Sequence, residues 1–401
     1  MISVDQVQYA AKMLKGKVIR TPLIHSPSLS EMFGGEIYLK LENLQKTGSF
    51  KIRGATHYML ANQDRIGPGG VVAASAGNHA QGVALAARQA RIPATIVMPE
   101  WSSISKQEAT RGYGGEIVIE GKNLGESLKK AEEMAQEGKT FIHPFDDPDI
   151  MTGQGTIALE ILEDLKEIDM IIVPIGGGGI ISGIASIVKS IKPTVDVIGV
   201  QSIACPSAYE SYHSGEITKV SSEYSIADGI SVKQVGTLNF DIIRKFVDNV
   251  VLVEEDQIAA AILLLLERKK ILAEGSGAVS LAALLNGSVK VHRKKKVVLL
   301  ISGGNVDSSL LGRILSQGLL KNRRIMRISV RLSDTPGSLS QLLIIISALK
   351  ANVLHIYHDR NVRNLPIYVT HVDLELETRG PEHVEEIVQK LTLEGYKFEL
   401  K

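Results

Sequence analysis

The chain has 401 residues, in which 45 lysines and arginines nearly cancel 44 aspartates and glutamates. This length predicts two or three domains, and the balanced charge argues against nucleic acid or an anionic membrane as a partner and favours a small-molecule ligand. The first residues lack a secretory pattern, no apolar run approaches membrane-spanning length, and Cys205 is the single cysteine. We therefore expect a cytoplasmic protein with no disulfide and no cysteine-based metal cluster.

The first three quarters of the chain are expected to form an α/β body. Ser3 is followed three residues later by Gln6, the pattern of a capping box that opens a helix. Short apolar runs then alternate with helix-like stretches, and the runs expected to be strands are 71–74, 94–98, 116–119, 170–173, 195–200 and 297–301. Such alternation predicts mostly parallel sheets covered by helices on both faces.

A different pattern begins after the basic run 321–324. The expected elements are a strand at 325–333, a helix at about 337–350, strands at 351–358 and 366–377, a helix at 382–394 and a strand at 396–400. This βαββαβ order predicts a small ferredoxin-like domain, with the turn of its central hairpin at 363–366. We place the boundary near residue 322, which gives domains 1–321 and 322–401.

Lys51 stands at a junction between a loop and a helix, in the sequence Thr47-Gly48-Ser49-Phe50-Lys51-Ile52-Arg53. A lysine amine with an ordinary pKa of about 10.4 is protonated and unreactive at neutral pH. A site that lowers this pKa, helped by the positive end of a helix, would make the amine a nucleophile suited to Schiff-base chemistry. From these residues alone, an ordinary solvated lysine at a helix start is the alternative.

Four consecutive glycines separate an expected strand from an expected helix, and they are Gly176, Gly177, Gly178 and Gly179. Unpaired backbone amides at a helix N-terminus form a cradle for a phosphate group. The spacing is not that of a dinucleotide-binding loop, and no Gly-Lys-Ser/Thr follows, so neither a dinucleotide nor a nucleoside triphosphate is expected. A purely structural glycine turn is the alternative.

Two further loops follow expected strands, and loops at the carboxyl ends of parallel strands converge on one crevice. The first loop contains Ser75, Ala76, Gly77, Asn78 and His79, and the second begins with Ser302. The first loop could bind a carboxylate, and the Asn78 amide could reach a phenolic oxygen. A reactive lysine, a phosphate cradle, a carboxylate loop and a hydroxyl together suit pyridoxal phosphate with an amino-acid substrate.

These motifs resemble those of the serine and threonine dehydratases, which are pyridoxal-phosphate enzymes of fold type II, over nearly the whole chain. The resemblance implies a two-lobed body like the tryptophan synthase β-subunit. It implies that Lys51 holds the cofactor as an internal aldimine, Phe50 packs on its ring, Asn78 bonds the ring hydroxyl, Gly176 to Gly179 bind the phosphate and Ser302 faces the ring nitrogen. The loop from Ser75 to His79 would hold the substrate carboxylate.

The implied reaction is β-elimination, which would convert L-threonine to 2-oxobutanoate and ammonia and L-serine to pyruvate. The alternatives are a serine-preferring dehydratase, a β-replacement enzyme and, more remotely, a non-catalytic amino-acid sensor. Ala76 stands where the related serine racemases carry a serine, so racemisation is not expected. Gln201 and Ser207 stand where those relatives carry acidic metal ligands, so we expect no divalent metal.

The C-terminal segment resembles an ACT domain, a regulatory module that binds amino acids between copies of itself. Asp334, Gly337 and Asn352 lie where such domains place loops that face the effector. The resemblance suggests an amino-acid effector, with end products such as isoleucine as examples, and a homodimer or homotetramer. A purely oligomerising role is the alternative.

Overall fold

The computed structural model describes residues 2–360 and 366–401 and divides into two compact units, Met1–Asp307 and Ser308–Lys401. The boundary predicted near residue 322 follows helix α13 (Ser308–Lys321), which the structure groups with the second unit. The change of sequence pattern at 322 therefore marks the end of this helix, whereas the compact units separate before it. In the described ranges, no helix combines the length and apolarity needed to cross a membrane.

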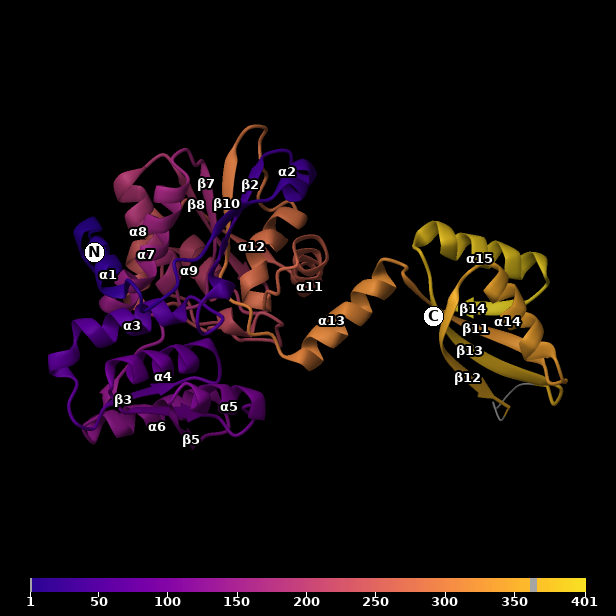
Figure 1. Cartoon of the computed structure of the whole chain (residues 1–401), viewed down its shortest axis with the longest axis horizontal. Coiled ribbons are helices and arrows are strands. Elements are labelled where there is room, and N and C mark those ends of the chain that lie inside the picture. Colours follow the sequence, from indigo (N-terminus) through magenta and orange to yellow (C-terminus); the bar gives the residue numbers. More distant parts are fainter. Residues whose placement is uncertain (1, 361–365) are drawn as a thin grey trace. The chain divides into compact units, whose positions relative to one another are not determined.

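The larger lobe of the first unit is built on a six-stranded sheet of order β1-β2-β10-β7-β8-β9 (Figure 1). Its strands are β1 (Leu23–His25), β2 (Glu36–Leu41), β7 (Met170–Pro174), β8 (Asp196–Ser202), β9 (Asn249–Val253) and β10 (Lys296–Ile301). The β1–β2 pair is antiparallel and the other pairs are parallel. Because helices cover both faces, the central strands are almost continuously apolar.

The helices of this lobe are α1 (Val4–Leu14), α2 (Pro27–Phe33), α7 (Pro148–Asp164), α8 (Gly179–Ile191), α9 (Ser207–Ser214), α10 (Thr237–Phe246), α11 (Glu255–Leu264) and α12 (Gly275–Leu285). Short helical turns lie at Glu42–Leu44, Asp228–Ile230 and Leu265–Lys269. The predicted capping box of α1 is confirmed, because Ser3 Oγ accepts a bond from the Gln6 amide while Gln6 Oε1 accepts one from the Ser3 amide. Helices α7, α8 and α10 share one buried core with β7, β8 and β10, and α12 packs against the same sheet.

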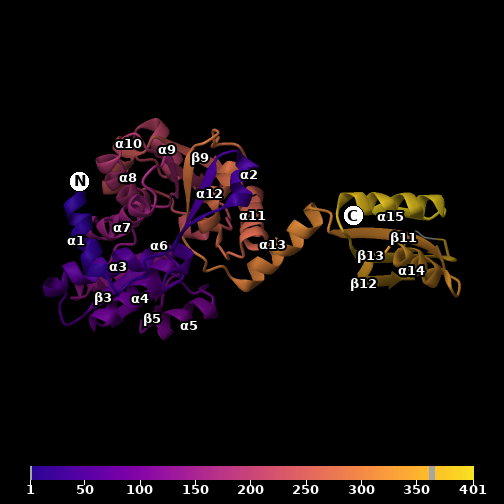
Figure 2. The same ribbon diagram turned by 45° about the horizontal axis from the view of Figure 1, so that its top comes forward.

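The smaller lobe, which contains the elements labelled β3, β5 and α4 to α6 in Figure 2, has a four-stranded parallel sheet of order β5-β4-β3-β6. Its elements are β3 (Val71–Ala74), β4 (Ala94–Met98), β5 (Glu116–Ile119), β6 (Thr140–Phe141), α3 (Lys51–Ala61), α4 (Asn78–Ala90), α5 (Ile104–Gly112), α6 (Leu124–Gln136) and the turn Gln63–Arg65. Val71 and Ala73 pack with Ile52 of α3, whereas Val72 and Ala74 pack with Ala131 of α6. Helices therefore cover both faces, as the sequence predicts.

The second unit contains the predicted βαββαβ order. After α13 come β11 (Ile325–Ser333), α14 (Ser338–Ala348), β12 (Asn352–Asp359), β13 (Val369–Glu377), α15 (Pro381–Leu393) and β14 (Lys397–Leu400). The antiparallel sheet has the order β12-β13-β11-β14, and the even-numbered residues of β11 and β13 face the two helices. The ferredoxin-like fold is confirmed. The hairpin turn predicted at 363–366 lies largely outside the described residues.

A buried cluster of charges joins α3 to the larger lobe, and we call it the Arg53 cluster, consisting of Lys40, Glu42, Arg53 and Glu160. The Arg53 guanidinium donates to both oxygens of Glu42 at 2.8 Å and to the two oxygens of Glu160 at 2.7 and 2.9 Å. Lys40 Nζ donates to Glu160 at 2.5 Å. Two cations therefore balance two carboxylates inside the protein, two residues along α3 from Lys51.

Candidate active site

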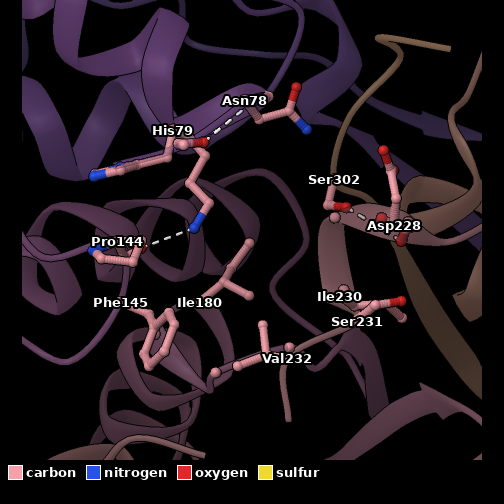
Figure 3. A pocket seen from close by; sticks show the side chains of 18 of the residues that line it. Asn78, His79, Pro144, Phe145, Ile180, Asp228, Ile230, Ser231, Val232 and Ser302 are labelled. Carbon is pink, nitrogen blue, oxygen red and sulfur yellow. Dashed lines mark hydrogen bonds between the residues drawn. The ribbon is translucent and has the colours of Figure 1, made fainter. Parts of the chain in front are cut away.

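A cavity of about 230 Å³ lies between the two lobes of the first unit, where β3, β7 and β10 end. Every residue that the sequence assigned to catalysis, cofactor or substrate lines it, and these residues are Phe50, Lys51, Ser75, Ala76, Gly77, Asn78, His79, Gly176, Gly177, Gly178, Gly179 and Ser302. Figure 3 shows Asn78 and His79 on one wall, Ser302 and Asp228 on another, and Phe145 and Val232 at a third side. The convergence of these loops is confirmed, and their individual roles stay predictions.

Lys51 is the first residue of α3, and its amine points into the cavity wall. Its Nζ donates a hydrogen bond of 2.8 Å to the carbonyl of Pro144, marked by a dashed line in Figure 3, and lies 5.2 Å from the centre of the Phe50 ring. Burial lowers the pKa of Lys51 to about 8, and the charge of Glu274 opposes this change. Part of the amine is therefore unprotonated near neutral pH, as a nucleophile requires.

The glycine loop connects β7 to α8 and leaves no room for side chains. Gly178, the N-cap of α8, has a φ of 104°, and a Cβ there would lie 2.7 Å from the Cβ of Asn239. A Cβ at Gly177 would lie 2.4 Å from carbons of the Phe145 ring. The loop thus presents bare backbone at the start of a thirteen-residue helix, a geometry that suits a phosphate group.

Replacing Gly178 with alanine is expected to weaken cofactor binding at least about tenfold, because the backbone strain of about 1–3 kcal/mol would distort the cradle. The dissociation constant of pyridoxal phosphate, measured by titration of the purified variant, checks this. Gly112→Ala is the matched control, since a Cβ at Gly112 has no atom within 4 Å and the backbone there does not have a positive φ. Equal affinity of the two variants would contradict the proposed cradle.

The loop after β3 presents a hydroxyl, backbone amides and Asn78 to the cavity. The Ser75 hydroxyl accepts a bond of 3.2 Å from the Gly77 amide, and Asn78 begins α4. His79 donates from Nε2 to the carbonyl of Ile142, and burial lowers its pKa to about 3, so the ring is neutral. His79 therefore supports the loop, while the hydroxyl and amides can bind a carboxylate.

The structure adds Glu274 and Asn305 to the wall of the cavity, and the sequence alone assigned a role to neither. Asn78 Nδ2 donates to Glu274 Oε1 at 2.6 Å, and Asn305 Nδ2 donates to Asn78 Oδ1 at 2.7 Å. Asn305 lies in the predicted Ser302 loop. Glu274 directly precedes α12 and is flanked by small residues in the segment 273–277. A single acid among small residues is the sequence feature that could have marked it as a candidate site residue. On the same side, Ser302 Oγ donates to the carbonyl of Ser276 at 3.3 Å.

Gln201 and Ser207 stand where the related racemases carry acidic metal ligands, and here both side chains form hydrogen bonds with the backbone. The Gln201 Oε1 atom accepts bonds from the amides of Ala208 and Tyr209 at 2.8 and 3.2 Å. Ser207 Oγ donates to the carbonyl of Val232 at 2.5 Å. These bonds fix the start of α9 beside β8.

In the second unit, the loop between β11 and α14 lines another cavity. Asp334 and Gly337 both contribute to it, together with Arg360, whose guanidinium lies 3.2 Å from the Asp334 carboxylate. Asn352 is not among its lining residues, and its side chain donates to Glu377 at 3.3 Å. The structure thus brings together two of the three predicted effector residues.

Comparison with known proteins agrees with this geometry. A family model described as pyridoxal-phosphate dependent enzyme matches residues 14–303, which include all the lining residues named above except Asn305. The chain belongs to this family. The match ends before the second unit begins at Ser308.

Individual members of the family are similar over most or all of the chain. L-threonine ammonia-lyase of Thermotoga maritima is 48% identical over 402 residues, which cover 100% of both chains. The catabolic L-threonine dehydratase of Escherichia coli K12 is 45% identical over 78% of this chain and 96% of its own length. The solved structure of maize serine racemase superposes with a TM-score of 0.75 at 35% identity, over 80% of this chain and 99% of that one.

The residues present fit the family's cofactor. Pyridoxal phosphate needs an amine for its aldehyde, a cradle for its phosphate and polar groups around its ring. Lys51, the glycine loop with its excluded Cβ positions, Asn78 and Ser302 supply these features in one cavity.

Proposed function

We propose that the protein is a pyridoxal-phosphate-dependent L-threonine ammonia-lyase, which converts L-threonine to 2-oxobutanoate and ammonia and also acts on L-serine. The observation that carries this proposal is the 48% identity with an L-threonine ammonia-lyase along the full length of both chains. The lining of the cavity supports it, because a reactive lysine, an anion-binding loop and a glycine cradle converge there.

The groups that line the cavity then divide the work of binding and proton transfer among them. The bare amides of Gly176 to Gly179 bind the cofactor phosphate, and the Ser75 loop at the start of α4 holds the substrate carboxylate. When bound, the cofactor withdraws electrons from the α-carbon of the substrate and so eases loss of its proton. Lys51, whose pKa burial lowers to about 8, accepts that proton with its Nζ atom. The β-hydroxyl leaves with a proton as water, and the resulting enamine tautomerises to an imine that a water molecule hydrolyses to 2-oxobutanoate and ammonia.

Ala76 separates this reaction from racemisation. The maize relative is named a serine racemase, and reversing a stereocentre requires a proton donor on the face opposite the lysine. Ala76 lines the cavity with a methyl group, which carries no exchangeable proton. We therefore expect the α-proton to be removed without being returned from the other face.

The test of the function is 2-oxo acid release by the purified chain supplied with pyridoxal phosphate. L-Threonine and L-serine are compared, with D-threonine as the control substrate. Faster release from L-threonine supports the proposal, and faster release from L-serine supports a serine dehydratase instead. Cofactor binding without release would favour β-replacement, which a sulfide acceptor would reveal. No cofactor binding would favour an amino-acid sensor.

We further propose that the second unit binds an amino-acid effector in the cavity of Asp334 and Gly337. Groups that suit both charges of an amino acid line this cavity, because Asp334 can receive the ammonium, while Arg360, its ion-pair partner at 3.2 Å, and the N-terminus of α14 can receive the carboxylate. Edge strand β12 exposes Leu354 and Tyr357, which supports a homodimer or homotetramer. Asn352 does not line this cavity, so it would contact an effector only if the effector bound between two copies of the chain.

Replacing Asp334 with alanine is expected to raise the dissociation constant of the effector at least about tenfold, because a charge-assisted hydrogen bond is lost. Calorimetric titration of the full chain with isoleucine and valine, which carry no β-hydroxyl to eliminate, identifies the ligand and measures this change. Glu385→Ala, an exposed acid on α15, is the control. An unchanged dissociation constant in the Asp334 variant would place the effector elsewhere.

A further inference from the structure

Glu274 is a buried acid in the wall of the catalytic cavity. The residue is 5% exposed, and its own amide donates to the carbonyl of Gly303 at 3.1 Å. A Cβ at residue 303 would lie 2.3 Å from Glu274 Oε1. The Ser302 loop therefore approaches the carboxylate so closely that a side chain at residue 303 would displace it, and the acid lies beside the loops that carry Asn78 and Ser302.

The carboxylate engages the amide that faces the cofactor. Glu274 Oε1 accepts a bond of 2.6 Å from Asn78 Nδ2, while Asn78 Oδ1 accepts one of 2.7 Å from Asn305. Asn305 Nδ2 lies 2.8 Å from the carbonyl of Thr47, in the loop before Lys51. Both ends of the Asn78 amide are thereby oriented. Because an amide nitrogen carries two N–H groups, one can serve Glu274 and the other a ligand oxygen.

The charges around Glu274 come from both lobes. Asp228 and Lys106 also line the cavity, with Lys106 Nζ 3.2 Å from Asp228, and Lys51 lies on α3. Burial, together with the charge of Asp228, raises the pKa of Glu274 to about 7. Burial lowers the pKa of Lys51 to about 8, and the Glu274 charge counteracts it. The hydrogen-bond partners of the acid, the Asn78 side-chain amide and the Asn305 backbone amide, are both neutral, while the Lys106 charge lowers its pKa. Glu274 and Lys51 line the same cavity, so the carboxylate charge can act on the lysine amine.

We propose that Glu274 is a positioning residue of this site, which fixes the amide of Asn78 toward the cofactor and sets the protonation of Lys51 through its charge. The inference rests on the proposed function only where it names the cofactor as the ligand of Asn78. Its two parts are separable. A glutamine at 274 can still accept the bond from Asn78 but carries no charge, whereas an alanine removes both the bond and the charge.

The experiment compares Glu274→Gln, Glu274→Ala and the control Glu210→Gln, an exposed acid on α9 of the same lobe. In the full-length chain before cofactor is added, the rate at which an acylating reagent labels Lys51 is followed against pH by peptide mass spectrometry. The dissociation constant of pyridoxal phosphate is then measured for each protein. Circular dichroism verifies that each variant is folded.

Both Glu274 variants should label Lys51 with a midpoint at lower pH than the unchanged chain, since loss of the carboxylate charge removes an influence that raises the lysine pKa. Glu274→Gln should keep cofactor affinity within about threefold, and Glu274→Ala should weaken it about tenfold, the effect of one lost hydrogen bond. Glu210→Gln should change neither.

An unchanged Lys51 midpoint in Glu274→Gln would overturn the electrostatic role, and equal cofactor affinity of the glutamine and alanine variants would overturn the orienting role. If the alanine variant does not fold, the glutamine variant alone decides the electrostatic role, and Glu274→Leu, which fills similar space but accepts no hydrogen bond from Asn78, decides the other. Labelling of Lys51 needs no turnover. A shifted midpoint in a chain that does not deaminate threonine would therefore refute the proposed function and leave this inference standing.

Discussion

Replacing Lys51 with alanine is expected to lower 2-oxobutanoate release from L-threonine by at least about 10⁴-fold, because the amine serves both as nucleophile and as base. Alanine is the best helix former and Lys51 opens α3, so the fold should persist. The lost contacts are one hydrogen bond to the carbonyl of Pro144 and the approach of the amine to the Phe50 ring. Turnover assays at saturating cofactor, with circular dichroism as a check of folding, measure both effects.

Lys46→Ala is the matched control for this prediction. Lys46 lies five positions earlier in the same segment, is exposed and donates from its amine to the carbonyl of Gly16. Its replacement should leave turnover within about threefold, since a surface hydrogen bond contributes little. Retention by Lys51→Ala of more than about a tenth of the original turnover would refute the assigned role of the lysine.

Replacing Arg53 with alanine is expected to lower the free energy of unfolding of the first unit by about 3–5 kcal/mol. The substitution leaves Glu42 and Glu160 inside the protein with Lys40 as the single remaining cation of the Arg53 cluster. Arg53→Lys should recover only part of this loss, because an ammonium cannot form the paired bonds that the guanidinium makes with both carboxylates.

Urea unfolding followed by tryptophan fluorescence measures this change in the first unit, because Trp101, in the smaller lobe, is the single tryptophan of the chain. Arg20→Ala is the control. Arg20 also pairs with two acids, Glu163 and Asp164, but its side chain is 49% exposed, so its loss should cost about 0–1 kcal/mol. An equal decrease in the free energy of unfolding for the two arginine variants would show that burying the Arg53 cluster does not increase its contribution to stability.

In both units, the spacing of apolar residues along the sequence was enough to predict strands that the structure contains. All six strands expected between 71 and 301 are present within one or two residues, because strands buried on both faces must be almost entirely apolar and stand out from amphipathic helices. The βαββαβ unit was equally readable, since β11 and β13 alternate between a face covered by helices and an open one. The domain boundary predicted near residue 322 stays a prediction. The sequence pattern changes after α13, whereas the contacts group this helix with the second unit, because contacts made in the folded chain do not show in the local sequence pattern.

Local sequence motifs were enough to predict many of the residues that line the cavity, namely a lysine at a helix start, four glycines after one strand and polar loops after two other strands. These are recognisable because loops at the carboxyl ends of parallel strands must converge. The environment of Lys51, the contacts of Glu274 and the composition of the Arg53 cluster could be seen only in the folded protein. A pKa and a buried ion pair depend on distances between residues remote in sequence, such as the 196 positions between Asn78 and Glu274, and on the exclusion of water that packing alone produces.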